Sequence, residues 1–171
     1  MGFSKSFAII GVLVIALIGG CVQYSFTGTS IPSDVRTIYI SFFPDNSQSG
    51  LGDLTDRINQ ALVNRFVNQS RLSLTSNEDS ADSTLEGAIQ TYTNRPFSIG
   101  GDQQANINEI QIVVRAEFRF AKDDEPIYSK TFTGSGTYNV QEDPVDGEIA
   151  AAEEALQEIA ESAFNDAVST W

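Results

Sequence analysis

The chain of 171 residues contains no histidine and only one cysteine, Cys21. A single cysteine cannot form a disulfide within the chain, and the absence of imidazole removes the usual ligand sets for zinc and copper. A nucleophilic cysteine normally needs a neighbouring base, which is most often histidine. The sequence therefore argues against a zinc or copper centre and against a catalytic thiol.

Basic residues are also scarce. Ten lysines and arginines stand against twenty-three aspartates and glutamates, so the formal net charge is −13. Affinity for nucleic acid depends on neutralising phosphates, and docking onto an anionic membrane depends on basic clusters. The charge balance predicts that nucleic acid is not a partner and that no broad electrostatic contact with a membrane forms.

Motifs of catalytic and metal sites are missing as well. The acidic pairs, for example residues 142–143 and 153–154, are typical of solvated surface charge rather than of paired catalytic carboxylates. Neither residues 45–50 nor residues 77–82 combine the required glycine and terminal glutamate at the spacing of a calcium loop, and residues 97–102 lack the lysine of a phosphate-binding loop. We therefore predict no enzyme activity, no catalytic residue and no metal site.

What the sequence does contain begins with an apolar N-terminal run. Lys5 is followed by FAIIGVLVIALI at residues 7–18, which carries no charge. As a helix this run would span roughly 18 Å, well short of the ~30 Å hydrocarbon core of a bilayer. It is typical of the apolar region of a secretory signal peptide.

The residues after this run explain the lone cysteine. Ile18-Gly19-Gly20-Cys21 resembles the box of bacterial lipoprotein signals, in which cleavage precedes a lipidated cysteine. We expect residues 1–20 to be the signal peptide, and Cys21 to carry a diacylglycerol thioether and an N-acyl chain, with no other cofactor. The alternative is an ordinary signal peptide whose cleavage site happens to fall near a cysteine.

Cleavage would leave 151 residues, the size of one domain. Because Lys5 is removed, nine basic residues would oppose twenty-three acidic ones and the net charge would be −14. Residues 22–26 lack the acidic run that resembles surface-export tags, so we expect a lipid anchor in the periplasmic leaflet of the outer membrane. Residues 21–36 would form the lipidated N-terminal segment and residues 37–171 the domain.

In the first part of the domain, apolar residues recur with two different periods, first every second position and then every fourth. Residues 37–43 alternate as a half-buried strand does, and the residues expected on its buried side are Ile38, Ile40 and Phe42. Residues 52–69 repeat apolar residues at every fourth position, namely Leu54, Ile58, Leu62 and Phe66. This pattern predicts an amphipathic helix with Asp53 as its N-cap.

Strands dominate the middle of the chain. Residues 71–75 predict a short strand, and residues 85–93 alternate in a longer one. Residues 110–120 alternate most regularly, with six apolar residues on one face and Gln111, Arg115, Glu117 and Arg119 on the other. Residues 127–138 predict a further strand, in which Gly134 and Gly136 indicate a bulge or a close backbone approach.

Residues 144–171 repeat apolar side chains at helical spacing and predict a long C-terminal helix. The simplest way to bury these stripes is an α+β fold. We predict an antiparallel-rich mixed sheet of about four strands, with two helices packed on one face.

Two groups of residues are candidates for binding. The segment between the two long strands would offer Pro96, Phe97 and Ile99 to a partner at an exposed tip, or would fold back over the edge of the core. Arginine and lysine side chains suit phosphate binding, although cross-strand ion pairs are the alternative. The basic candidates are Arg95, Arg115, Arg119 and Lys130.

The whole mature chain also resembles a known family. The box around Cys21, the following YSFTG, the strand TIYISFF and the distal FNDAVSTW resemble the lipopolysaccharide-assembly lipoproteins of the LptE family, in the form found in Bacteroidetes. The resemblance implies two helices on a mostly four-stranded sheet. It also implies binding of lipopolysaccharide through basic side chains near the sheet and the loop tips.

The resemblance further implies a role and a partner. The lipoprotein would plug a β-barrel translocon of the LptD type in a 1:1 complex, assist its assembly, and support insertion of lipopolysaccharide into the outer leaflet. The alternative is a periplasm-facing lipoprotein that binds glycan or other envelope components.

Overall fold

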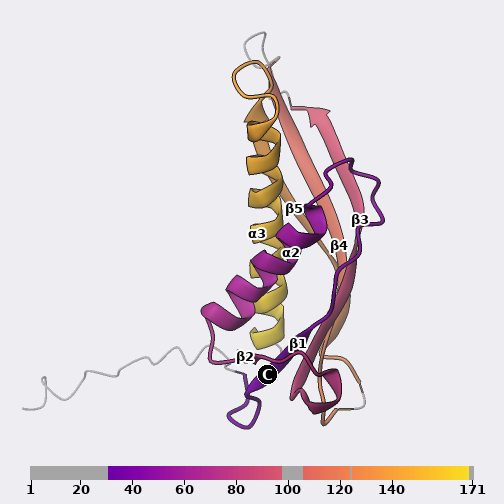
Figure 1. Ribbon diagram of the computed structural model, residues 1–171, viewed down its shortest axis with the longest axis vertical. Helices are drawn as coiled ribbons and strands as arrows, with labels where there is room; N and C mark the ends of the chain where they lie inside the picture. The colour runs from indigo at the N-terminus through magenta and orange to yellow at the C-terminus, as the bar shows by residue number, and fades with distance from the viewer. Residues whose placement is uncertain (1–30, 98–105, 124, 170–171) are drawn as a thin grey trace, which may run out of the picture.

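The computed structural model describes residues 31–97, 106–123 and 125–169 (Figure 1). Their elements follow the predicted order of strand, helix, short strand, three longer strands and helix. The bounds are β1 Thr37–Ile40, α2 Leu54–Val63, the π-helix η1 Asn64–Asn68, β2 Ser73–Leu74, the short 3-10 helix η2 Glu78–Ser80, β3 Ser83–Pro96, β4 Ile107–Phe120, β5 Tyr128–Asn139 and α3 Asp146–Ser169.

One mixed sheet has the strand order β2-β1-β3-β4-β5. β1 runs parallel to both β2 and β3, whereas β3, β4 and β5 are antiparallel neighbours. The register of β3 shifts between Ile89 and Thr91, while β4 and β5 pair without a shift. The sheet has five strands rather than about four, because the short strand predicted at residues 71–75 joins it as the two-residue β2. The predicted α+β class is confirmed.

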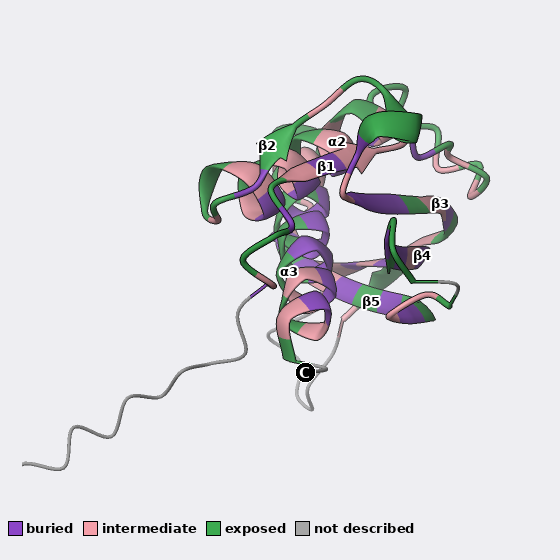
Figure 2. Cartoon of the chain, turned by 90° about the horizontal axis from the view of Figure 1, so that it is seen from below, coloured by how far each residue is buried: buried purple, intermediate pink, exposed green. Residues whose placement is uncertain are grey.

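The helices share one side of the curved sheet (Figure 2). The buried face of β4 is the predicted one, since its even-numbered residues from Ile110 to Phe120 are at most 3 % exposed. These side chains pack with α3 and with the buried stripe of α2 and η1, which consists of Leu54, Ile58, Leu62 and Phe66. In the parts of the chain that the structure describes, no helix lies on the opposite face of β3, β4 and β5.

The predicted strand 37–43 ends earlier than expected. β1 stops at Ile40, and Phe43 rather than Phe42 enters the core. Phe42 is 68 % exposed, whereas Phe43 is fully buried beside Gly87 of β3. A Cβ atom at Gly87 would lie 2.4 Å from the Phe43 ring, so this glycine makes room for the aromatic side chain. The prediction that Phe42 faces inward is therefore wrong.

The predicted helix 52–69 also differs in detail. It is α-helical only to Val63 and continues as the π-helix η1. Asp53 occupies the N-cap position but makes no capping hydrogen bond with its side chain. Its carboxylate instead accepts a hydrogen bond from Nε of Arg57 at 2.9 Å, which explains the missing cap.

The long helix α3 packs closely on β5. A Cβ atom at Gly134 would lie 2.0 Å from the carbonyl oxygen of Ala155, and one at Gly136 would lie 2.1 Å from that of Ala151. Of the two predicted alternatives for these glycines, the close backbone approach is therefore confirmed. A bulge is not present, because β4 and β5 pair without a register shift. Trp171, which the helical pattern included, lies outside the described residues.

The edge of the sheet at β5 is partly covered by the same helix. Glu158 of α3 accepts a hydrogen bond of 2.9 Å from the backbone N–H of Ser135. Unpaired backbone groups at a sheet edge invite pairing with other chains, and a covering side chain reduces this tendency. Among the described helices, none combines the length and apolarity needed to span a membrane.

Candidate functional site

The uncovered side of the sheet is the main candidate surface, and we call it the outer sheet face. Its side chains alternate with the buried ones along β3, β4 and β5. They are Glu86, Ala88, Thr91, Thr93 and Arg95 of β3; Glu109, Gln111, Val113, Arg115, Glu117 and Arg119 of β4; and Ser129, Thr131, Thr133, Ser135 and Thr137 of β5.

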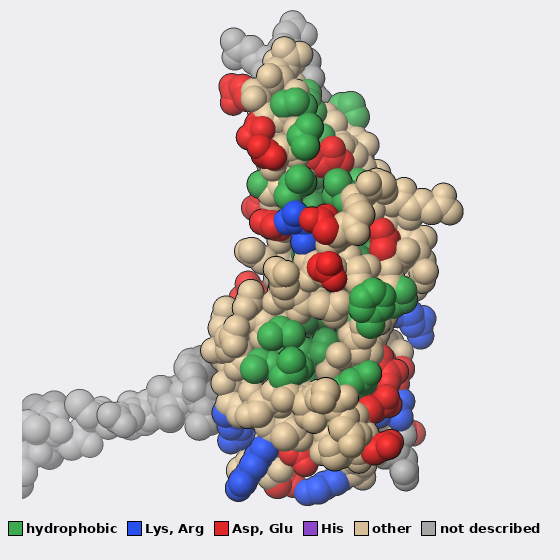
Figure 3. All heavy atoms as spheres, viewed as in Figure 1, with side chains coloured by type: hydrophobic (Ala, Val, Ile, Leu, Met, Phe, Trp, Pro, Cys, Tyr) green, Lys and Arg blue, Asp and Glu red, His purple; other side chains and the backbone are tan. Residues whose placement is uncertain are grey.

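This face is hydroxyl-rich and balanced in charge. It carries three arginines and three glutamates, and every outward residue of β5 from Ser129 to Thr137 is serine or threonine. The helix layer, which consists of α2, η1 and α3, differs in its charge, because α3 contains seven acidic residues and no basic one. Figure 3 views the helix layer and shows acidic side chains over its upper part, with basic side chains gathered near the lower end.

Arg95 lies at the upper end of this face, near the tip of the β3–β4 hairpin. It pairs across the strands with Glu109, whose Oε2 accepts from Arg95 Nε at 2.9 Å and from Nη2 at 2.7 Å. The predicted loop segment is thus partly strand, because Arg95 and Pro96 belong to β3. Arg95 therefore forms a cross-strand ion pair, which was the predicted alternative to phosphate binding.

Arg119 and Arg115 lie on the same face of β4. Arg119 donates a hydrogen bond to the carboxylate of Glu117, and this contact lowers the pKa of Glu117 and raises the pKa of Arg119. Arg115 donates from Nη2 to the hydroxyl of Ser129 at 3.3 Å. Within the described parts of the chain, Arg115 makes no ion pair within 4.0 Å, so its guanidinium is the most available of the candidate cations.

Lys130 does not join the three arginines. It lies opposite Ala116, on the side of β5 that faces the helices. Its ammonium group pairs with Asp166 of α3 and lies 5.2 Å from the centre of the Phe132 ring. Lys130 therefore lies on the strand that pairs with β4 but on the opposite face from Arg115, because the antiparallel register places even-numbered residues of β5 inward.

The predicted contact residues at the tip are only partly described. Pro96 is exposed at the end of β3, and Phe97 is half-buried with its backbone N–H bonded to the carbonyl of Ile107 at 2.8 Å. Ile99 and the predicted lipidation site Cys21 lie outside the described residues.

Beneath the same end of the hairpin, a polar cluster joins the sheet to α3. The hydroxyl of Tyr92 donates to Glu148 at 2.6 Å, and Nδ2 of Asn94 donates to the hydroxyl of Tyr138 at 2.8 Å. Burial, together with the bond to Glu148, raises the pKa of Tyr92, so its hydroxyl stays protonated. This cluster escaped the sequence analysis because its members are far apart along the chain.

Two further features also escaped prediction. The serine and threonine period along β5 was visible in the sequence and could have marked the outer sheet face. The second feature is a groove between α3 and the helix formed by α2 and η1. It was not visible in the sequence, because the pairing of α2 with α3 depends on tertiary packing.

Among the described residues, no group of histidine, cysteine, aspartate or glutamate could hold a metal ion.

The fold is shared with solved structures of bacterial proteins, among them two lipoproteins. A protein from Xanthomonas campestris is 14% identical with a TM-score of 0.58, covering 83% of this chain and 90% of its own. A minor lipoprotein from Acinetobacter baumannii is 12% identical with a TM-score of 0.53, covering 79% and 94%. Lipoprotein B from Nitrosomonas europaea is 11% identical with a TM-score of 0.53, covering 83% and 86%.

The sequence identifies the family. The model of the LptE lipopolysaccharide-assembly family matches residues 35–170, so the chain belongs to this family. Membership in this non-enzymatic assembly family agrees with the prediction that the chain is not an enzyme. No curated protein sequence matches the chain significantly. The Bacteroidetes form of the family stays a prediction.

Proposed function

We propose that this protein is an outer-membrane lipoprotein that plugs a β-barrel lipopolysaccharide translocon of the LptD type and assists its assembly. One copy would serve each barrel and support insertion of lipopolysaccharide into the outer leaflet. The lipid on Cys21 would hold the domain at the periplasmic leaflet, since each buried methylene adds about 0.8 kcal/mol to membrane affinity. Anchoring would also raise the local concentration of the domain beside its partner.

The observation that carries the proposal, beyond family membership, is the character of the outer sheet face. The interior of a large membrane barrel is polar, so a plug needs a polar surface without large apolar side chains. Val113 is the only branched aliphatic residue of this face, and its charges balance. Such a surface can meet a polar lumen without bringing a net charge into the contact.

The β3–β4 hairpin would supply the second contact. Its two strands have 14 residues each, and its tip, where β3 ends and β4 begins, extends beyond α2 (Figure 1). We propose that Pro96, Phe97 and Ile99 contact the barrel wall there. Apolar residues at a projecting tip are well suited to anchor a contact that is otherwise polar.

Lipopolysaccharide would meet the basic residues of the same face. Arg115 is the first candidate, because its guanidinium can bind a phosphate bidentately without first breaking an ion pair. Arg95 and Arg119 would have to exchange a carboxylate for a phosphate, and Lys130 would have to leave Asp166. We therefore expect an Arg115→Ala change to weaken binding more than an Arg95→Ala change does.

Depletion of the protein in its own cells tests the proposal. Without the plug, the barrel partner should accumulate in a misassembled form, which semi-native electrophoresis of the outer membrane detects. Gentle detergent extraction should recover the protein together with one barrel chain, identified by mass spectrometry. A normally assembled barrel in depleted cells would rule the proposal out.

A further inference from the structure

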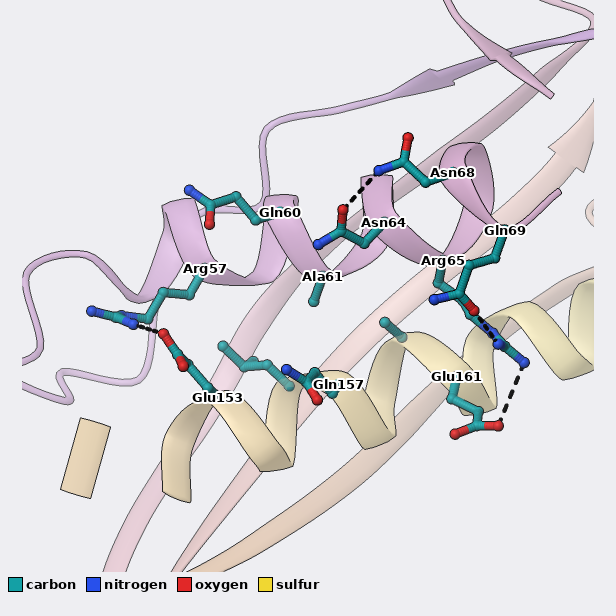
Figure 4. A pocket seen from close by; sticks show the side chains of 12 residues that line it. Arg57, Gln60, Ala61, Asn64, Arg65, Asn68, Gln69, Glu153, Gln157 and Glu161 are labelled. Carbon is teal, nitrogen blue, oxygen red and sulfur yellow. Dashed lines mark hydrogen bonds and ion pairs between the residues drawn. The ribbon is translucent and has the colours of Figure 1, made fainter. Parts of the chain in front are cut away.

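The helix layer contains a polar groove that the proposed function does not use. It has a volume of about 490 Å³ and runs between α3 and the continuous helix formed by α2 and η1 (Figure 4). Ligand sites typically measure ~300–1,000 Å³. The groove lies on the helix side of the sheet, away from the outer sheet face.

Ion pairs close both ends of the groove. Arg57 of α2 pairs with Glu153 of α3 at one end, and Nη2 of Arg65 lies 3.4 Å from Glu161 at the other. Ala61 and Gln157 lie between these two pairs (Figure 4). The two cations and two anions leave the lining without net charge.

Amide side chains supply most of the remaining polar groups. They are Gln60, Asn64, Asn68, Gln69 and Gln157. Each amide offers two donors and one acceptor oxygen, so the set can both donate to and accept from a ligand. The small apolar residues Ala61 and Ala160 and one leucine complete the lining.

Much of this hydrogen-bonding capacity is unused. In the described parts of the chain, the side chains of Gln60 and Gln157 make no hydrogen bond, although Asn68 donates to Asn64 at 2.8 Å. Nε of Arg65 is buried and also lacks a partner there. The amide groups that are not engaged within the protein can hydrogen-bond a ligand in the groove.

The wall of the groove is also unusual in its backbone. Asn64, Arg65 and Asn68 belong to the π-helix η1. π-helical turns are rare and occur frequently at functional sites. The irregular segment therefore supplies three of the polar side chains that line the groove.

We propose that this groove binds an uncharged oligosaccharide. Sugar hydroxyls both donate and accept, as the amides do, whereas the lining offers little apolar surface to a lipid chain. Anionic sugars are disfavoured, because α3 carries seven acidic residues and Arg57 is already shared by Asp53 and Glu153. The proposal does not depend on the barrel, and it concerns a different surface from the one that would contact it.

Calorimetric titration of the full-length protein in detergent tests the proposal. The probes are the uncharged oligosaccharide fraction of delipidated lipopolysaccharide, separated from its acidic and phosphorylated fragments, and, as an unrelated neutral glycan, cellotetraose. Binding of the first alone supports the site and identifies lipopolysaccharide as its source, and binding of both supports a general glycan site. Failure of both probes at millimolar concentration, or tighter binding of a phosphorylated oligosaccharide, overturns the proposal.

A double variant locates the binding. Asn64→Ala combined with Gln157→Ala should weaken binding about tenfold or more, because roughly one hydrogen bond is lost at each position. Gln111→Ala on the outer sheet face is the matched control and should bind as the unaltered protein does. Unchanged circular dichroism establishes folding, and unchanged affinity of the double variant would place the site elsewhere and refute the inference.

Discussion

Two adjacent phenylalanines are expected to differ strongly in their contribution to the stability of the fold. Phe43 is fully buried against Gly87, and Phe42 is 68 % exposed. Phe43→Ala should lower the free energy of unfolding by about 3–5 kcal/mol, because it removes buried apolar area and leaves a cavity. Phe42→Ala should change it by no more than about 0.5 kcal/mol. Urea denaturation of both variants checks the difference, and equal losses would contradict this placement.

The same pair shows what a sequence pattern cannot predict. Strict alternation from Ile38 and Ile40 predicts that Phe42 faces inward. The alternation ends where β1 ends, and the inward position passes to Phe43 because the missing side chain of Gly87 leaves space on β3. That space depends on which strands become neighbours, and local periodicity does not contain this information.

At the scale of elements, α3 approaches β5 so closely that the positions of β5 beneath it have room only for glycine. Gly136→Ala should lower the free energy of unfolding by about 2 kcal/mol or more, because its new methyl group would meet the backbone of Ala151. Gly52→Ala is the control, since no atom lies within 4 Å of a Cβ atom there. Thermal unfolding measures both, and an unaffected Gly136→Ala variant would disprove the close approach.

Asp82 joins the start of β3 to the start of β1. Its Oδ2 accepts hydrogen bonds from the backbone N–H groups of Arg36 and Thr37 and from the Thr37 hydroxyl, at 2.9–3.0 Å. The backbone bond from Arg36 contributes most to lowering the pKa of Asp82. Because the folded-state pKa lies below the unfolded value of about 4, this stabilisation exists above about pH 4 and is lost as the pH falls through the folded-state pKa.

Asp82→Asn should therefore flatten the loss of stability in acid. Urea midpoints measured from neutral to acidic pH should fall less steeply in this variant than in the unaltered protein. Asp79→Asn, on the exposed turn η2, serves as the control and should retain the full slope. An identical acid profile for Asp82→Asn would show that the carboxylate does not hold the two strands.

Periodicity predicted the elements better than it predicted their assembly. The long strands, both helices and the α+β class follow from apolar periods of two and about four, as the buried stripe through Leu62 and Phe66 illustrates. The register shift at Ile89 depends on the pairing of β3 with β4, which are distant segments of the chain. Three of the four basic candidates share the outer sheet face, because β4 alternates regularly and Arg95 lies opposite Glu109.

At the scale of the whole molecule, the fold separates two kinds of surface. The helix layer presents the acidic α3 and the amide groove, and the other side presents the charge-balanced outer sheet face. A domain with two such sides needs a fixed orientation in the envelope if each side is to meet a different partner. The predicted lipid at Cys21 would provide one fixed point for this orientation.

A Cys21→Ser change tests the anchor. The variant should lose metabolic labelling with radioactive fatty acid and should leave the outer-membrane fraction, because the thioether cannot form. The protein should appear as an uncleaved precursor or in the soluble fraction on immunoblots. Unchanged lipid labelling would show that the predicted modification site is wrong.

Photo-crosslinking in living cells tests the central proposal most directly. A photoreactive residue in place of Thr131, exposed on the outer sheet face, is compared with one in place of Glu154, exposed on α3. We predict a strong crosslink from position 131 to a single outer-membrane barrel protein and a much weaker one from position 154. The absence of any barrel protein from the products at position 131 would contradict it.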